Sequence, residues 1–221
     1  MTISPRPEYS CLSDDATMSN GIRESVHSEA RGQALTEFAL TIPLLLILIM
    51  ATFEFGLAMV ANVSINRAAQ TGAHMASIAG NTQGADCLIL DEVERSITAP
   101  NDRSAIQNVQ IQRTSLIGEQ TLAANDWARD GSTDCTLNNG DVVTVPYSRV
   151  SGAYPNDQRC NMLGGCPLLT PARTTVDNIG VAVRYQHDWK TPLGSLVPLV
   201  GGDTTGWTFE QRDIFRMEPH L

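Results

Sequence analysis

Residues 32–63 read GQALTEFALTIPLLLILIMATFEFGLAMVANV, and this stretch decides how the chain is organised. Within it, 39–53 is a run of fifteen uncharged residues, which gives only about 22 Å of helix against a hydrocarbon core of about 30 Å. We therefore expect a membrane-spanning helix from Phe38 to Val63, 26 residues and about 39 Å long, which crosses the bilayer with tilt.

A short polar segment stands directly before this span. A glycine at Gly32, followed by four residues and Glu37, is typical of a processing site, because cleavage after Gly32 makes Gln33 the N-terminus. Alone at the membrane edge, the Glu37 carboxylate costs little, but an unpaired charge buried in a bundle of helices costs at least about 2.5–3.5 kcal/mol. A partner such as the amine of processed Gln33 would then set the axial register between subunits. The alternative is a glutamate that only ends the apolar run.

Glu54 lies inside the expected span, about 24 Å of helix beyond Phe38 and close to the far interface. Its side chain can snorkel to water without any further role. It can also contact a helix of a partner subunit. The physics of the sequence favours neither alternative.

Positive charge indicates the orientation of the span. Arg23 and Arg31 precede it closely, whereas Arg67 alone follows it closely. The positive-inside rule therefore places the N-terminus in the cytoplasm and the residues after about Arg67 on the other side of the membrane.

The helical pattern continues beyond the span. Small residues recur there at steps of three and four, so one face of the helix lets another element approach closely. Gly80 followed by Asn81 is typical of a helix end. The stripe consists of Ile65, Ala68, Ala69, Gly72, Ala73, Ala76 and Ala79.

The rest of the chain predicts an α+β fold with a small antiparallel sheet that leans on the long helix. Residues 86–99 have an amphipathic helical pattern that Pro100 ends. Residues 138–141 have the composition of a turn, and residues 152–171 that of a surface loop, either plain or able to meet a partner. Strands are expected around residues 109–114, 142–145, 179–185 and 207–209.

Cysteine placement supports an oxidising compartment for this domain. Cys11 precedes the span, and the other four follow it, an even number on one side. Of the three possible pairings we expect Cys87 with Cys135 and Cys160 with Cys166. Four buried thiols are the alternative, and a zinc site is disfavoured because no pair has the short C-x2-C spacing.

Composition and motifs argue against several functions. The net charge is -9 and the basic residues are scattered, whereas a nucleic-acid binder needs clustered Lys and Arg. The sequence has no H-E-x-x-H, G-x-S-x-G or phosphate-binding loop, so we expect no catalytic residue, metal or cofactor. His187 and Asp188 are interpreted as a solvated strand end.

Four pieces of sequence occur together in residues 31–80: RGQALTEFAL at 31–40, IPLLL at 42–46, FEFG at 53–56 and NRAAQTGA at 66–73. Together they resemble the TadE-like pseudopilins of tight-adherence (Tad) pili. The end of the chain is similar to that family less sharply, whereas residues 81–176 match no pattern and the leader is unusually long. By this resemblance, Gly32 precedes the cut made by a separate prepilin peptidase, and Gln33 is the mature N-terminus. Glu37, next to Phe38, sets the registry between subunits. Glu54 is a second membrane glutamate with a packing role.

The resemblance implies three parts: a cytoplasmic prepilin-type leader at 1–32, a long helix at 33–80 with its transmembrane part at about 38–63, and a pilin-like periplasmic domain at 81–221. It implies a single-pass protein of the bacterial inner membrane that acts as a non-enzymatic minor pilin in adherence or secretion. Its partners would be the prepilin peptidase, other pilins and the Tad inner-membrane assembly machinery. The alternatives are a signal-anchored periplasmic binding module outside any pilus and an anchored hydrolase, which needs a polar cluster that the sequence lacks.

Overall fold

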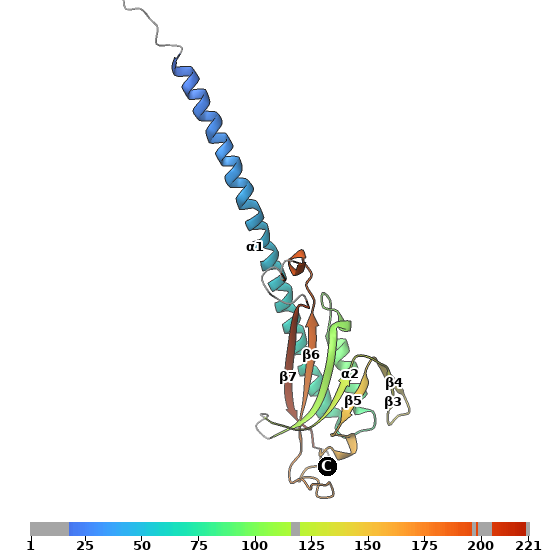
Figure 1. Ribbon diagram of the computed structural model, residues 1–221. Helices are drawn as coiled ribbons and strands as arrows, with labels where there is room; N and C mark the ends of the chain where they lie inside the picture. The colour runs from blue at the N-terminus through green and yellow to red at the C-terminus, as the bar shows by residue number, and fades with distance from the viewer. Residues whose placement is uncertain (1–17, 116–119, 196–197, 199–204, 220–221) are drawn as a thin grey trace, which may run out of the picture. The chain divides into compact units, whose positions relative to one another are not determined.

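The computed structural model describes residues 18–115, 120–195, 198 and 205–219. The chain divides into two units, Met1–Ala51 and Thr52–Leu221. Helix α1, Met18–Ala79, begins in the first unit, continues through Gly32 without a break and ends in the second (Figure 1). The sequence-based prediction of one long apolar helix that stops before Gly80 is confirmed, and Gly80 takes the positive φ of 58° that glycine accepts readily.

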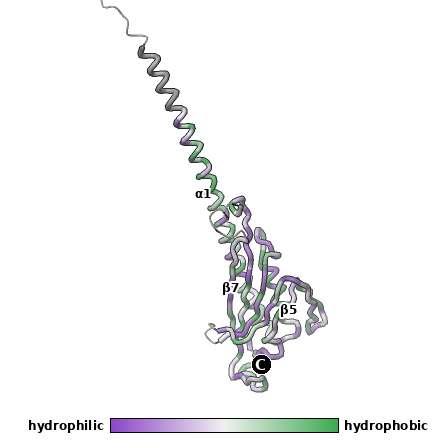
Figure 2. Tube along the Cα trace, in the orientation of Figure 1, coloured by the Kyte–Doolittle hydropathy of each residue, from purple (hydrophilic) through white to green (hydrophobic). Residues whose placement is uncertain are grey.

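The described side chains of the first unit are almost all exposed, although many are large and apolar. Leu40 is 79% exposed and Leu44 66% exposed. By length and composition, the segment Gly32–Ala79 of α1 is able to cross a membrane. Figure 2 shows hydrophobic residues along the described part of this helix. Exposed apolar side chains of this kind are typical of a helix that is surrounded by lipid or by other helices.

The second unit is an α+β domain, as the sequence predicts. Its larger sheet has the strand order β5-β2-β1-β6-β7, with every neighbouring pair antiparallel, and β3 with β4 forms a separate hairpin. The expected helix is α2, and the expected strands are β1, β4, β6 and β7, whereas β2, β3 and β5 were not expected. The elements are α2 Ala85–Ser96, β1 Ile106–Thr114, β2 Thr121–Ala128, β3 Thr133–Thr136, β4 Val142–Val145, β5 Ser148–Gly152, β6 Asn178–His187 and β7 Trp207–Arg216, with 3-10 turns at Arg103–Ala105, Asn156–Gln158 and Pro192–Ser195.

The core of the second unit lies where α1 and α2 cover one face of the larger sheet. In register, Val109 of β1 lies opposite Val183 of β6, and Ile111 lies opposite Val181, so the four side chains share a face. The small residues of α1 are buried in the same cluster. A Cβ added to Gly72 would lie 2.6 Å from Val93 of α2 and 3.3 Å from Val181. The stripe of small residues therefore brings the backbone of α1 close to both α2 and β6. Its buried members include Ala68, Ala69, Gly72, Ala73 and Ala76.

We predict that Gly72→Leu destabilises the second unit by about 1–3 kcal/mol, because the larger side chain overpacks the contact with Val93 and Val181. The matched control is Gly56→Leu, since a Cβ at Gly56 meets nothing within 4 Å. Urea unfolding of the full chain in detergent, followed by tryptophan emission, measures both variants. Equal stability of Gly72→Leu and Gly56→Leu would contradict the close packing of α1.

Candidate functional site

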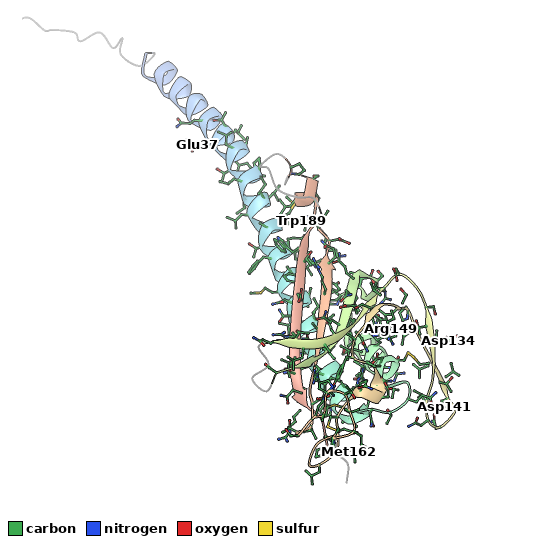
Figure 3. The ribbon with its side chains drawn as sticks, turned by 60° about the horizontal axis from the view of Figure 1, so that its bottom comes forward. Glu37, Asp134, Asp141, Arg149, Met162 and Trp189 are labelled. Atoms are coloured by element: carbon green, nitrogen blue, oxygen red, sulfur yellow. A yellow bond between two sulfur atoms is a disulfide. The ribbon has the colours of Figure 1, made fainter. Side chains whose placement is uncertain are left out.

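The segment that the sequence predicts to be a processing and assembly site is helical in the structure. The side-chain amide of Gln33 donates to the carboxylate of Glu37 over 3.0 Å, one helical turn further on. Figure 3 shows Glu37 on α1. Phe38, the neighbour of Glu37, is 63% exposed. Gln33 and Glu37 thus lie on one helix face, so an amine at Gln33 would lie one turn from the carboxylate.

Gly32 has no packing role that requires glycine. A Cβ built at this position meets no atom within 4 Å, and its backbone belongs to a continuous helix. Glycine in a helix interior costs about 0.5–1 kcal/mol relative to alanine. The fold therefore offers no reason for a glycine here.

The second glutamate, Glu54, lies in a different environment. Its side chain is 1% exposed, and its carboxylate accepts the backbone N–H groups of Lys190 over 3.0 Å and Thr191 over 2.9 Å. His187 Nε2 lies 3.4 Å from the same carboxylate. All these partners belong to the second unit. The sequence predicted snorkelling to water or contact with another subunit, and it did not foresee these intramolecular contacts.

His187 is packed among aromatic rings at the end of β6. Its ring stacks on Trp207 with centroids 6.2 Å apart, and Trp207 in turn lies 5.0 Å from Trp189. His187 is only 4% exposed, so its interpretation as part of a solvated strand end is wrong. The reason is that the carboxylate of Glu54 and the ring of Trp207 cover the imidazole.

Both predicted cysteine pairs are present. Cys87 of α2 bonds to Cys135 of β3 with Cα atoms 6.1 Å apart, and Cys160 bonds to Cys166 with Cα atoms 5.6 Å apart. The first disulfide ties the small hairpin to α2, and the second closes a turn within the loop that the sequence predicted at residues 152–171. Each bond of this kind typically contributes about 2–4 kcal/mol.

Buried polar groups fix the rest of that loop. Asp86 of α2 accepts from the Arg159 guanidinium and, over 2.9 Å, from Asn125 of β2. Tyr154 donates its hydroxyl to Asp177 over 2.9 Å, and its pKa is raised by burial and by that carboxylate. Each buried charge thus has a partner of opposite charge or a hydrogen bond, as burial demands.

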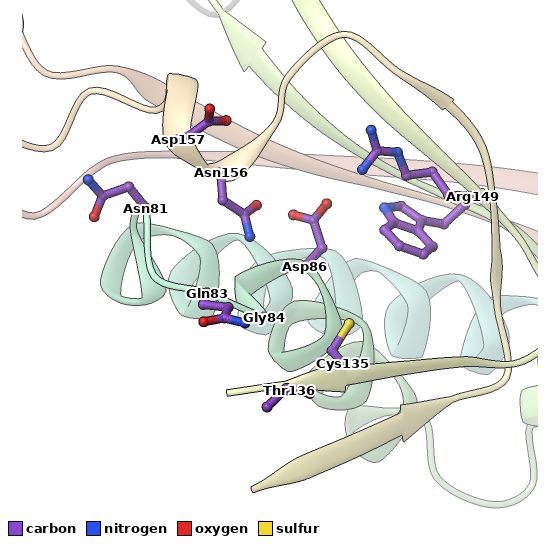
Figure 4. Close-up of a pocket in the computed structure, with 10 residues that line it drawn as sticks. Asn81, Gln83, Gly84, Asp86, Cys135, Thr136, Arg149, Asn156 and Asp157 are labelled. Atoms are coloured by element: carbon purple, nitrogen blue, oxygen red, sulfur yellow. The ribbon is translucent and has the colours of Figure 1, made fainter. Parts of the chain in front are cut away.

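A cavity of about 480 Å³ lies beside these contacts, between the start of α2 and the 3-10 turn Asn156–Gln158. Figure 4 shows Asp86, Asn156 and Arg149 around it. Both oxygens of Asp86 are already used in the structural contacts to Arg159 and Asn125. Among the described residues that line the cavity there is no histidine, and the described part of the chain has no group of three or more His, Cys, Asp or Glu that could hold a metal ion. The arrangement suits structural support and offers no nucleophile–base pair.

Comparisons with known proteins support the resemblance of the helix. Residues 32–74 match the family model described as TadE-like protein. No curated protein and no solved structure matches the chain. The matched range begins at Gly32 and ends inside the buried stripe of α1, so it includes Glu37 and Glu54 and excludes the sheet.

We predict that Glu54→Ala lowers the stability of the second unit by about 1–3 kcal/mol, because the N–H groups of Lys190 and Thr191 lose their acceptor. Glu37→Ala is the matched control, since the described partner of that side chain is Gln33 in the first unit. Urea unfolding of the full chain in detergent distinguishes them. A Glu54→Ala chain as stable as the control would show that this carboxylate does not anchor the loop.

Proposed function

We propose that this chain is a minor pilin, or pseudopilin, that supports assembly of a Tad-type pilus for surface adherence or secretion. The observation that carries the proposal is the family match over residues 32–74, which covers both glutamates and the processing glycine. The proposed role is structural rather than enzymatic. Its proposed partners are a prepilin peptidase, other pilins and the inner-membrane assembly machinery of the pilus.

Processing after Gly32 is supported by the surroundings of that residue. A glycine that no packing contact requires, inside a helix where it costs stability, points to a requirement from outside the chain. A peptidase that recognises a small residue before the cut supplies such a requirement. Gln33 then becomes the mature N-terminus.

Assembly through Glu37 is supported by its isolation. Within the described residues, its carboxylate has a hydrogen bond to the exposed Gln33 amide and no cationic partner. Among apolar helices of neighbouring subunits, this charge would need a stronger partner, which the amine of Gln33 on the same or another subunit provides. This demand would set the axial position of each subunit.

The proposed location is the bacterial inner membrane, with a cytoplasmic N-terminus and a periplasmic second unit. The apolar N-terminal helix fits a single-pass membrane protein. Arg23 and Arg31 before the span favour the cytoplasmic side for the leader. The two disulfides favour the periplasm for the domain, since that compartment is oxidising.

We predict that Gly32→Leu blocks removal of the leader when the chain is produced beside its own peptidase. A Cβ at position 32 meets no atom within 4 Å, so we expect the second unit to stay intact and the loss to be specific to processing. N-terminal sequencing and intact mass of the membrane-extracted protein measure the cut, with Gly56→Leu as the control that is still processed. A wild-type chain whose N-terminus remains uncleaved would instead favour the anchored periplasmic binding module.

We predict that Glu37→Ala is cleaved normally and fails to restore pili in a deletion strain. Its second unit keeps the wild-type fold, because the described contacts of Glu37 lie in the first unit. Shear-released fibres and surface attachment measure the defect. Normal piliation in the deletion strain itself would overturn the proposed function.

A further inference from the structure

We propose that the second unit rests on the bilayer through the end at which α1 enters it, with Trp189, Trp207 and Lys190 in the lipid headgroup region. This membrane-facing end also includes the exposed ring of Phe53. The partner is the lipid interface on the side of the membrane that the domain occupies. The inference requires that α1 crosses a membrane, and it does not require incorporation in a pilus.

The contacts of Glu54 limit how far the hydrocarbon can extend along α1. The carboxylate binds the N–H groups of Lys190 and Thr191, which belong to irregular backbone after β6. Irregular backbone and a carboxylate are both strongly disfavoured in lipid hydrocarbon. The hydrocarbon therefore ends at about Phe53, ten residues earlier than the Val63 expected from the sequence.

A span that ends at Phe53 is short, and the bilayer can adapt to it. With Glu37 at the near interface, residues 38–53 are 16 in number and form about 24 Å of helix, against a hydrocarbon core of about 30 Å. A bilayer accommodates a shorter hydrophobic stretch by local thinning and by snorkelling of the flanking side chains, at a modest cost. A locally thinned bilayer therefore needs no residue beyond Glu54, and α1 from Glu54 onwards is free to pack within the domain.

The side chains that meet this boundary have the chemistry of a membrane interface. Trp189 and Trp207 lie 5.0 Å apart, and Trp207 is 37% exposed. Lys190, the single lysine of the chain, is exposed next to Trp189. Tryptophan is enriched at headgroup level, and a lysine there can hold its stem on apolar surface and its ammonium among lipid phosphates.

The two tryptophans and Lys190 also lie at the end of the second unit where an interface with lipid is proposed. Figure 3 shows Trp189 beside α1 and Met162 at the other end of the sheet. Trp127, the third tryptophan, is 4% exposed in the core formed by β1, β6 and the helices. Two of the three tryptophans and the lysine therefore gather at the end of the unit where α1 enters.

Depth-dependent fluorescence quenching tests the proposal on the full chain. Three variants each retain one tryptophan: Trp127→Phe with Trp207→Phe, Trp127→Phe with Trp189→Phe, and Trp189→Phe with Trp207→Phe. They are reconstituted in phosphatidylcholine and phosphatidylglycerol vesicles that carry bromine either high or deep in the acyl chains. The wild-type chain is measured beside them, so that a variant that fails to fold does not decide the result.

We expect Trp189 and Trp207 to lose emission to the shallow bromines more than to the deep ones, and Trp127 to lose none to either. Wild-type emission should fall with the shallow bromines for the same reason. Quenching of Trp189 and Trp207 no greater than that of Trp127 would overturn the proposal by placing the end of the unit away from lipid. Stronger quenching by deep bromines would overturn it in favour of hydrocarbon that continues towards Val63. Either failure leaves the processing of Gly32 and the role of Glu37 untouched, so it is distinct from failure of the proposed function.

Discussion

The close approach of α1 to α2 and β6 is the contact on which the second unit depends. At Gly72 there is no space for even a Cβ, since Val93 and Val181 occupy it from two elements. Close packing of this kind needs small side chains, and dispersion falls off quickly when the gap widens. The same stripe explains how a helix that is apolar on every side over residues 42–51 becomes a core element in the second unit. Only the face with small residues turns inward there, while Val63 and Ile78 stay exposed.

Away from this core, polar contacts and disulfides hold the chain. The hairpin of β3 and β4 depends on the Cys87–Cys135 bond, and Glu94 of α2 accepts a hydrogen bond from the Tyr147 hydroxyl over 2.6 Å. Burial and that carboxylate raise the pKa of Tyr147. A small domain with a modest core gains from such covalent and charged ties, because each restricts the unfolded chain or satisfies a buried group.

The sequence predicted the elements whose patterns are local. Alternation in β6, the amphipathic run of α2 and the glycine after α1 each follow from neighbours a few residues apart. Strand β2 reads TLAANDWA and lacks alternation, and β5 is a short edge strand that is mostly exposed, so neither has a local signal. The acceptor role of Glu54 could not be predicted either, because its partner Lys190 is 136 residues away and contributes only its backbone. The burial of His187 could not be predicted for the same reason, because Glu54, which covers its ring, is distant in the sequence.

In the proposed assembly, the two glutamates of α1 differ in whether they need a partner from a neighbouring subunit. Glu54 has its hydrogen bonds within its own chain, so it brings no unsatisfied charge to an assembly. Glu37 has the amide of Gln33 over 3.0 Å and is otherwise surrounded by exposed side chains. A neutral amide satisfies one acceptor site of a carboxylate that has about four. In the proposed assembly, the free energy available to position a second subunit thus lies at Glu37, next to the end that cleavage at Gly32 would create.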